Sequence, residues 1–257
     1  MGVVGLLMGV LIAAGTDILE HWQPIVWAAV AVFAFIAGGN SLNDLTDREV
    51  DKMAHPERPL PSGRVTPKQV LYISMVCFVI SFLVSLALNL ESTMIVSLAI
   101  VLMFSYEVRL KRNALTGNLE IALLTGMLFL LGGAVVGMME RTYVIALLAF
   151  LAILGREIVK DIEDMEGDFD RKTLPKRVGA RKAGLFASAV FLVAVTLSPL
   201  PYLDGTFGIW YLGAVMFADA MFIYSAMVHF RNPTKGQKMA KYGMLLALLA
   251  FLVGGLM

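Results

Sequence analysis

The sequence predicts an all-α, polytopic membrane protein, and its composition is the first indication. Hydrophobic residues make up 58% of the 257 residues and charged residues only 16%, with a mean hydropathy of +0.77. A soluble domain is about half apolar and a quarter charged, so one water-soluble core cannot bury this much apolar surface. Composition therefore excludes an ordinary soluble enzyme, a disordered chain and, with Cys77 as the single cysteine, a disulfide-rich secreted domain. The net charge of +1 predicts no nucleic-acid partner.

Nine apolar runs predict the helices. A helix needs about 20 mostly apolar residues to cross the hydrocarbon core of a bilayer, and the runs lack the two-residue alternation of a membrane β-strand. They cover residues 3–19, 24–42, 68–89, 92–108, 119–138, 142–158, 183–200, 207–229 and 240–257. We predict a bundle of about nine transmembrane helices that forms a single domain over residues 1–257.

The basic residues predict the orientation of the chain. All 21 Lys and Arg residues except Arg141 lie in or beside the second, fourth, sixth and eighth connections between the runs. Lys and Arg remain on the cytoplasmic side during membrane insertion. We therefore expect an integral protein of the cell membrane whose N-terminus and even-numbered connections face the cytoplasm.

Two acidic segments, residues 43–51 and 161–168, follow the second and the sixth apolar runs. Each carries three aspartates spaced i, i+3, i+7, which places them on one face of a helix. The triplets are Asp44, Asp47 and Asp51 in the first segment and Asp161, Asp164 and Asp168 in the second. A basic, proline-containing stretch follows each triplet, and this likeness is typical of an internal repeat, here of four-helix units.

The two triplets predict a metal site. Three carboxylates on one helical face repel one another, so a cation is expected there unless the segment is only a solvated surface loop. Mg²⁺ takes one or two carboxylates, keeps water molecules and bridges to substrate phosphates. Two triplets at the cytoplasmic face could therefore hold Mg²⁺ around a diphosphate. A diphosphate whose tail points into apolar walls describes a polyprenyl diphosphate, and a dry cavity protects the allylic cation from water.

The two motifs resemble those of a known family. Asn43-Asp44-x-x-Asp47-x-x-x-Asp51 is similar to the first motif of the UbiA superfamily of intramembrane prenyltransferases, and residues 161–168 resemble its second. Residues 156–168 look most like the archaeal branch, so the resemblance implies geranylgeranyl transfer to geranylgeranylglyceryl phosphate in ether-lipid synthesis. It also implies a Mg²⁺-bridged diphosphate between the motifs. The implied metal-binding residues are Asn43 and the six aspartates, which are also the expected catalytic residues.

Further residues are expected to contact the substrates. By resemblance, Tyr106 and Lys111 correspond to a Tyr…Lys element near the diphosphate, and Asn118 corresponds to a pocket-facing asparagine. Asp219, in the middle of the eighth run, is expected to be structural or to line a cavity. The basic residues expected to contact the diphosphate or an acceptor phosphate are Arg58, Arg64, Lys160, Lys172 and Arg177.

Two other functions remain open. The same chemistry could prenylate an aromatic acceptor such as hydroxybenzoate or a quinone precursor, although the second motif lacks the Asp-Asp pair common in that branch. A cation-coupled transporter is a different class, but transporter carboxylates lie at the bilayer midplane on broken helices, and only Asp219 is deep here. The expected partners are a polyprenyl diphosphate, a lipophilic acceptor and membrane lipid, with no obligate protein partner.

Overall fold

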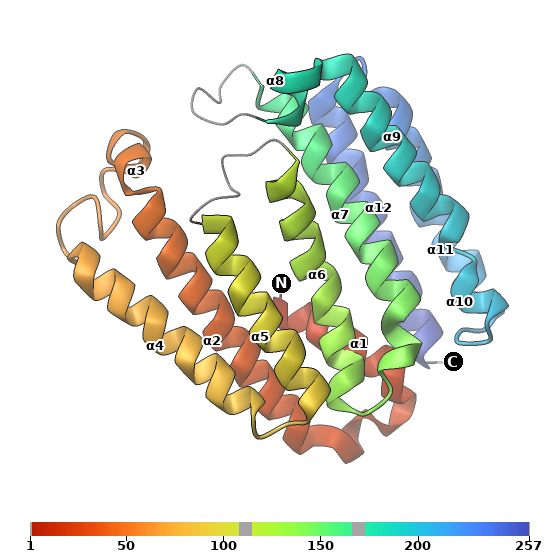
Figure 1. Cartoon of the computed structure of the whole chain (residues 1–257). Coiled ribbons are helices and arrows are strands. Elements are labelled where there is room, and N and C mark those ends of the chain that lie inside the picture. Colours follow the sequence, from red (N-terminus) through yellow and green to blue (C-terminus); the bar gives the residue numbers. More distant parts are fainter. Residues whose placement is uncertain (1, 108–114, 166–172, 257) are drawn as a thin grey trace.

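The computed structural model describes residues 2–107, 115–165 and 173–256, and these ranges contain helices and no strand. Each of the nine predicted runs overlaps one main helix of the described part of the chain (Figure 1). These helices are α1 (Gly2–Ala14), α2 (Trp22–Thr46), α4 (Pro67–Ser85), α5 (Leu90–Ser105), α6 (Thr116–Val135), α7 (Tyr143–Glu163), α9 (Ala180–Leu197), α11 (Ile209–Val228) and α12 (Pro233–Leu256). The short elements between them are η1 (Gly15–His21), α3 (Arg48–Ala54), η3 (Met139–Thr142), α8 (Leu174–Val178) and α10 (Leu200–Leu203).

Within these ranges, seven helical segments are long and apolar enough to cross a membrane. The first of them, Gly2–Thr46, contains α1, η1 and α2, while α5 has 16 residues and is shorter than the other candidates. The outer faces of the helices expose large apolar side chains such as Phe33, Tyr72 and Phe217, as expected of a surface in contact with lipid. The chain is an integral membrane protein.

Several helix boundaries differ from the prediction by a few residues, and for two of them the local cause is clear. The first run was expected to reach residue 19, but α1 ends at Ala14 because Gly15 has a φ of +60°, in the left-handed region that glycine adopts readily. The last run was expected to begin at residue 240, but α12 begins at Pro233. The Asn232 side chain accepts a hydrogen bond from the backbone N–H of Lys235 at 2.8 Å and so caps this early start.

The bundle is built from close helix pairs. α2 packs on α4, α1 lies against α6, α6 lies against α7, and α11 pairs with α12. Ser74 and Ser81 of α4 donate hydrogen bonds to backbone carbonyls of α2, at 2.8 and 2.9 Å. Where α1 meets α6, a Cβ on Gly132 would lie 2.6 Å from the backbone of Gly9, so only glycine permits this approach.

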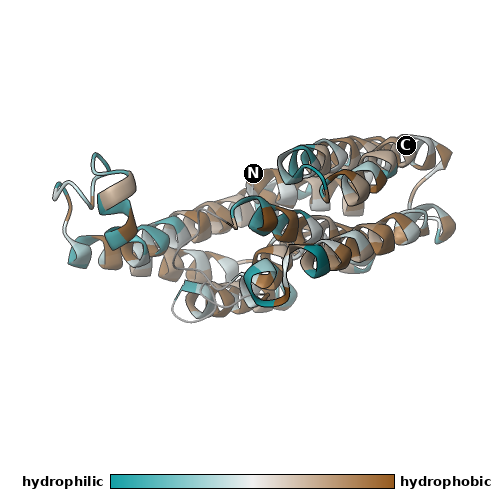
Figure 2. Ribbon diagram, turned by 90° about the horizontal axis from the view of Figure 1, so that it is seen from above, coloured by the Kyte–Doolittle hydropathy of each residue, from teal (hydrophilic) through white to brown (hydrophobic). Residues whose placement is uncertain are grey.

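The two motif-bearing helix ends lie at the same end of the bundle. α2 leads there into α3 and α7 leads there toward α8, although more than one hundred residues separate the two motifs (Figure 1). Figure 2 looks onto this end and shows hydrophilic residues on the α3 segment and at the near ends of several helices, with largely hydrophobic helix bodies behind them. The fold therefore brings both motif-bearing helix ends to the same end of the bundle.

Candidate active site

The first acidic motif lies on the junction of α2 and α3. The helix turn continues through Asp47, whose backbone N–H donates to the carbonyl of Asn43, and on to Asp51, whose N–H donates to the carbonyl of Asp47, both at 2.9 Å. Asp51 is buried, with 6% of its surface exposed. Arg58 Nη1 donates to Asp51 Oδ2 at 2.8 Å and lies 3.9 Å from Asp44 Oδ1. The loop after α3 thus brings one guanidinium to two of the three aspartates.

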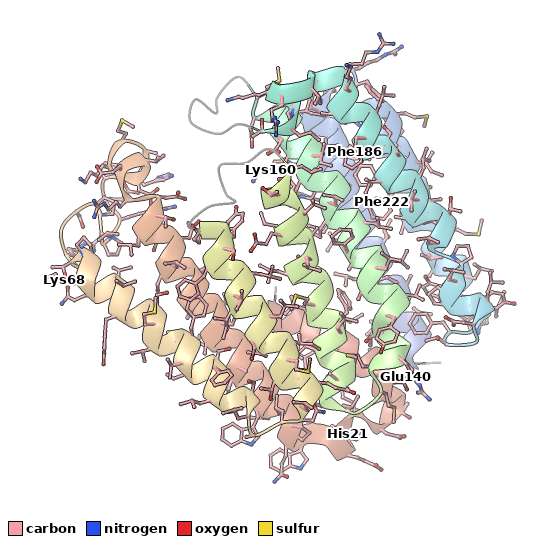
Figure 3. All side chains as sticks on the ribbon, in the orientation of Figure 1. His21, Lys68, Glu140, Lys160, Phe186 and Phe222 are labelled. Atoms are coloured by element: carbon pink, nitrogen blue, oxygen red, sulfur yellow. The ribbon has the colours of Figure 1, made fainter. Side chains whose placement is uncertain are left out.

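The second acidic motif begins on the last turn of α7. Asp161 Oδ2 accepts a hydrogen bond from Asn118 Nδ2 of α6 at 2.7 Å, and Asn118 itself is buried. Asp164 caps the C-terminal end of α7 and is exposed. Lys160 is half-buried, and Figure 3 shows it at the end of the bundle that carries α3 and α8, far from His21 and Glu140. The structure therefore places Asn118 against the second motif.

Three predicted site residues, Lys111, Asp168 and Lys172, lie outside the described residues. Of the remaining basic residues, Arg64 turns back on its own loop: its Nε donates to Ser62 Oγ at 3.1 Å and its Nη2 donates to the carbonyl of Glu57. Arg177 is exposed on α8.

Glu49, between the aspartates of the first motif, belongs to a different face. Lys52 Nζ lies 3.0 Å from Glu49 Oε2, and this hydrogen bond and positive charge hold the pKa of Glu49 below its ordinary value. The side chains of both residues are more than half exposed. This pair is a surface contact beside the site.

Sequence reasoning missed Glu107 as a site residue. It follows Tyr106 at the end of α5, is buried at 7% exposure, and its Oε2 accepts a hydrogen bond from Thr46 Oγ1 at 2.6 Å. This bond ties the end of α5 to the first motif. The sequence signal for Glu107 is an acidic residue at the start of an otherwise basic connection. An ordinary surface charge explains this pattern equally well.

The donor set fits Mg²⁺ held through a substrate. In the described ranges no three His, Cys, Asp or Glu side chains come together as one cage. Mg²⁺ rarely uses an all-protein cage and instead combines one or two carboxylates with water and phosphate oxygens. Asp44, Asp47 and Asp51 on one side and Asp161 and Asp164 on the other supply such carboxylates at one end of the bundle.

A cavity of about 670 Å³ lies among α1, α6, α7, α9, α11 and α12. This volume is in the usual range of ligand cavities, about 300–1,000 Å³. Its walls are mostly apolar, with Phe129, Phe222 and Phe251 among the lining residues (Figure 3 labels Phe222). Asp219 also lines it and accepts a hydrogen bond from Ser198 Oγ at 2.7 Å, so this acid has both of the roles that the sequence left open.

The acidic ends of α2 and α7, with an apolar cavity in the same bundle, define an integral membrane protein that can hold a charged headgroup and a hydrocarbon tail. Residues 3–252 match the UbiA prenyltransferase family, and the chain belongs to this family. It is therefore an intramembrane prenyltransferase.

Known proteins of similar sequence and structure narrow the comparison. The chain is 42% identical over 232 residues to a digeranylgeranylglyceryl phosphate synthase of Methanosarcina mazei, which covers 88% of this chain and 80% of that protein. A solved structure described as digeranylgeranylglyceryl phosphate synthase is 33% identical, has a TM-score of 0.89, and is matched over 99% of this chain and 93% of the other. A UbiA homologue from Archaeoglobus fulgidus, bound to GPP and Mg²⁺, shares the fold with a TM-score of 0.73 at 17% identity, over 98% and 94% of the two chains.

Proposed function

We propose that the protein transfers a geranylgeranyl group from geranylgeranyl diphosphate to geranylgeranylglyceryl phosphate, with Mg²⁺, in the synthesis of archaeal ether lipids. The observation that carries the proposal is the convergence of both acidic motifs at one end of a bundle that contains a large apolar cavity. Relatives named digeranylgeranylglyceryl phosphate synthase support the choice of acceptor. The homologue that binds GPP with Mg²⁺ supports the metal and the diphosphate.

The chemistry follows from these parts. The bond between the allylic carbon and the diphosphate oxygen breaks, and its electron pair leaves with the diphosphate. The acceptor hydroxyl oxygen captures the allylic cation and passes its proton to the released diphosphate or to an aspartate carboxylate. When bound, Mg²⁺ neutralises the charge that develops on the leaving diphosphate. The aspartates of both motifs position the headgroup, and Arg58 contributes positive charge beside Asp44 and Asp51. The apolar cavity walls keep water from the cation.

The proposal extends to topology. Nine membrane crossings, with the N-terminus and the active site on the cytoplasmic side, agree with the distribution of Lys and Arg and with the position of α3 and α8 at one end. α5 spans about 24 Å at 1.5 Å per residue, somewhat less than the hydrocarbon core, which a bilayer can accommodate by local thinning. The repeated placement of an acidic motif after the second and sixth long helices supports one domain built from two related four-helix units.

A direct assay tests this function. Purified protein in detergent with Mg²⁺ and radiolabelled geranylgeranyl diphosphate is offered geranylgeranylglyceryl phosphate or, separately, hydroxybenzoate. We expect a radiolabelled lipid with two prenyl groups and release of diphosphate only with the glyceryl phosphate. If a product forms only with hydroxybenzoate, the acceptor is aromatic and the proposed acceptor is wrong. If no diphosphate is released with either acceptor, the proposal is refuted.

A further inference from the structure

The apolar cavity carries two basic side chains among its lining residues: Arg156 of α7 and Lys241 of α12. We propose that this pair binds the phosphate monoester of the acceptor, at a subsite separate from the diphosphate held by the aspartate motifs. The proposal rests on the proposed function and specifies how its second substrate is recognised.

A hydrogen bond between the two helices sets the direction of these side chains. Gln237 Nε2 of α12 donates to Glu163 Oε2 of α7 at 2.8 Å, so the two helix faces that carry these residues point toward each other. Arg156 precedes Glu163 by two helical turns and Lys241 follows Gln237 by one turn, so each lies on the same face as its partner in that bond.

The two helices run in opposite directions, so both basic residues lie on the same side of that bond (Figure 1). At a rise of 1.5 Å per residue, Arg156 lies about 10 Å and Lys241 about 6 Å from the Gln237–Glu163 hydrogen bond along the helix axes, in the direction away from α3 and α8. Among the cavity-lining residues of α7 and α12, Arg156 and Lys241 are those nearest along the helices to the end that carries the acidic motifs.

The hydrogen bonding of Arg156 leaves capacity for an anion. Arg156 Nη1 contacts Glu157 Oε1, while Arg156 Nε is buried and has no hydrogen-bond partner in the described part of the chain. The Arg156 side chain is 20% exposed, and a buried guanidinium donor without an acceptor is unfavourable. Lys241 makes no ion pair with any described residue. A phosphate monoester supplies charged acceptor oxygens for both side chains.

The position relative to the second motif suits a glyceryl phosphate. Arg156 lies five residues before Asp161 on α7, about 7.5 Å along the helix. In the acceptor, the free hydroxyl is on the carbon next to the one that bears the phosphate. A phosphate held at Arg156 and Lys241 therefore places this hydroxyl between the basic pair and the headgroup at the acidic motifs. Arg58 is less suited to this role because it is already paired with Asp51 at 2.8 Å.

The test is substrate discrimination in Lys241→Gln. We expect the KM for geranylgeranylglyceryl phosphate to rise about 10- to 100-fold, the range for one lost hydrogen bond between charged groups. The KM for geranylgeranyl diphosphate should stay within about twofold of its original value. The parent protein and the variant should prenylate the unphosphorylated acceptor, geranylgeranylglycerol, at the same rate. The preference for the phosphorylated over the unphosphorylated acceptor should therefore be smaller in the variant. Arg156→Gln should also raise the KM for geranylgeranylglyceryl phosphate, and Arg156→Lys should give a KM between those of the parent protein and Arg156→Gln.

Lys238→Gln is the matched control, because Lys238 is on the same helix with its Nζ over the ring of Tyr242 at 6.0 Å, outside the cavity lining. If Arg156→Gln fails to fold, the exposed Lys241 still decides the question. A parallel rise in the KM for the diphosphate would assign the pair to the diphosphate instead, and an unchanged preference for the phosphate would exclude the subsite while the proposed function stands. A parent protein that prenylates no glyceryl phosphate would overturn the proposed function and this assignment together.

Discussion

The contact between Asn118 and Asp161 gives the sharpest test of how the second motif is positioned. Asn118→Ala removes the hydrogen bond that Asn118 Nδ2 donates to Asp161 Oδ2 at 2.7 Å, and Asn118 has only 7% of its surface exposed. A hydrogen bond to a charged partner contributes about 1.5–3 kcal/mol. If it orients Asp161 for metal binding, its loss lowers turnover about 10- to 100-fold.

The assay measures prenyl transfer against Mg²⁺ concentration in detergent. Asn118→Ala should need a higher Mg²⁺ concentration for half-maximal rate, because a misoriented Asp161 binds the metal–diphosphate complex more weakly. The matched control is Asn89→Ala at the opposite end of the α5–α6 pair, where Asn89 Nδ2 donates to the carbonyl of Ala134 at 2.5 Å. This control should lose stability and keep its Mg²⁺ dependence. An Asn118→Ala protein with the parent rate and Mg²⁺ dependence would refute the role given to this bond.

Three further predictions concern the metal, the first motif and the helix packing. Chelation with EDTA should abolish product formation and added Mg²⁺ should restore it, whereas activity that persists in EDTA would contradict the metal requirement. Arg58→Gln, which removes the 2.8 Å contact with the buried aspartate of the first motif, should raise the KM for the diphosphate about 10-fold. Lys52→Gln on the same segment should leave the KM for the diphosphate unchanged. If both substitutions raise this KM equally, only the net charge of the segment matters and not the Arg58–Asp51 contact. Gly132→Ala should destabilise the fold by about 1–3 kcal/mol in thermal unfolding, because its Cβ would meet the backbone of Gly9 at 2.6 Å. Gly213→Ala, which has open space around its Cβ, should be neutral; a neutral Gly132→Ala would show that α1 can move away from α6.

Hydropathy was enough to locate the helices because every segment that crosses a bilayer needs a long run of mostly apolar residues. Each of the nine runs overlaps one helix of the described ranges, where seven helical segments are long and apolar enough to cross a membrane. The boundaries needed local chemistry that a hydropathy window averages away. Gly15 ends α1 inside an apolar run because of its positive φ, and Asn232 with Pro233 starts α12 inside a basic stretch. Both signals are present in the sequence as ordinary glycine and capping rules.

The candidate site could be predicted from the sequence only where a repeated spacing marks it. The aspartate triplets could be read directly, and the structure brings Asn118 to the second of them. The Thr46–Glu107 bond joins residues 61 positions apart, so no local pattern could reveal it. From the sequence, Arg156 and Lys241 are interpreted as topological charges at two helix ends that are expected to face the cytoplasm. Only the packing of α7 on α12 shows that both line one cavity.

The separation of these charges suggests how one site can handle two phosphorylated substrates without confusing them. On the proposed assignment, the acidic motifs repel any phosphate that arrives without a metal, and they would hold the Mg²⁺ that promotes departure of the diphosphate. The acceptor phosphate must stay attached, so it is better held by cations that do not activate it as a leaving group. Arg156 supplies such a cation about one and a half helical turns before Asp161 on α7, and Lys241 of α12 supplies a second one among the same apolar walls. On the proposed assignment, the orientation of the acceptor follows from charge alone: its phosphate goes to the basic pair, and its hydroxyl is left facing the allylic carbon.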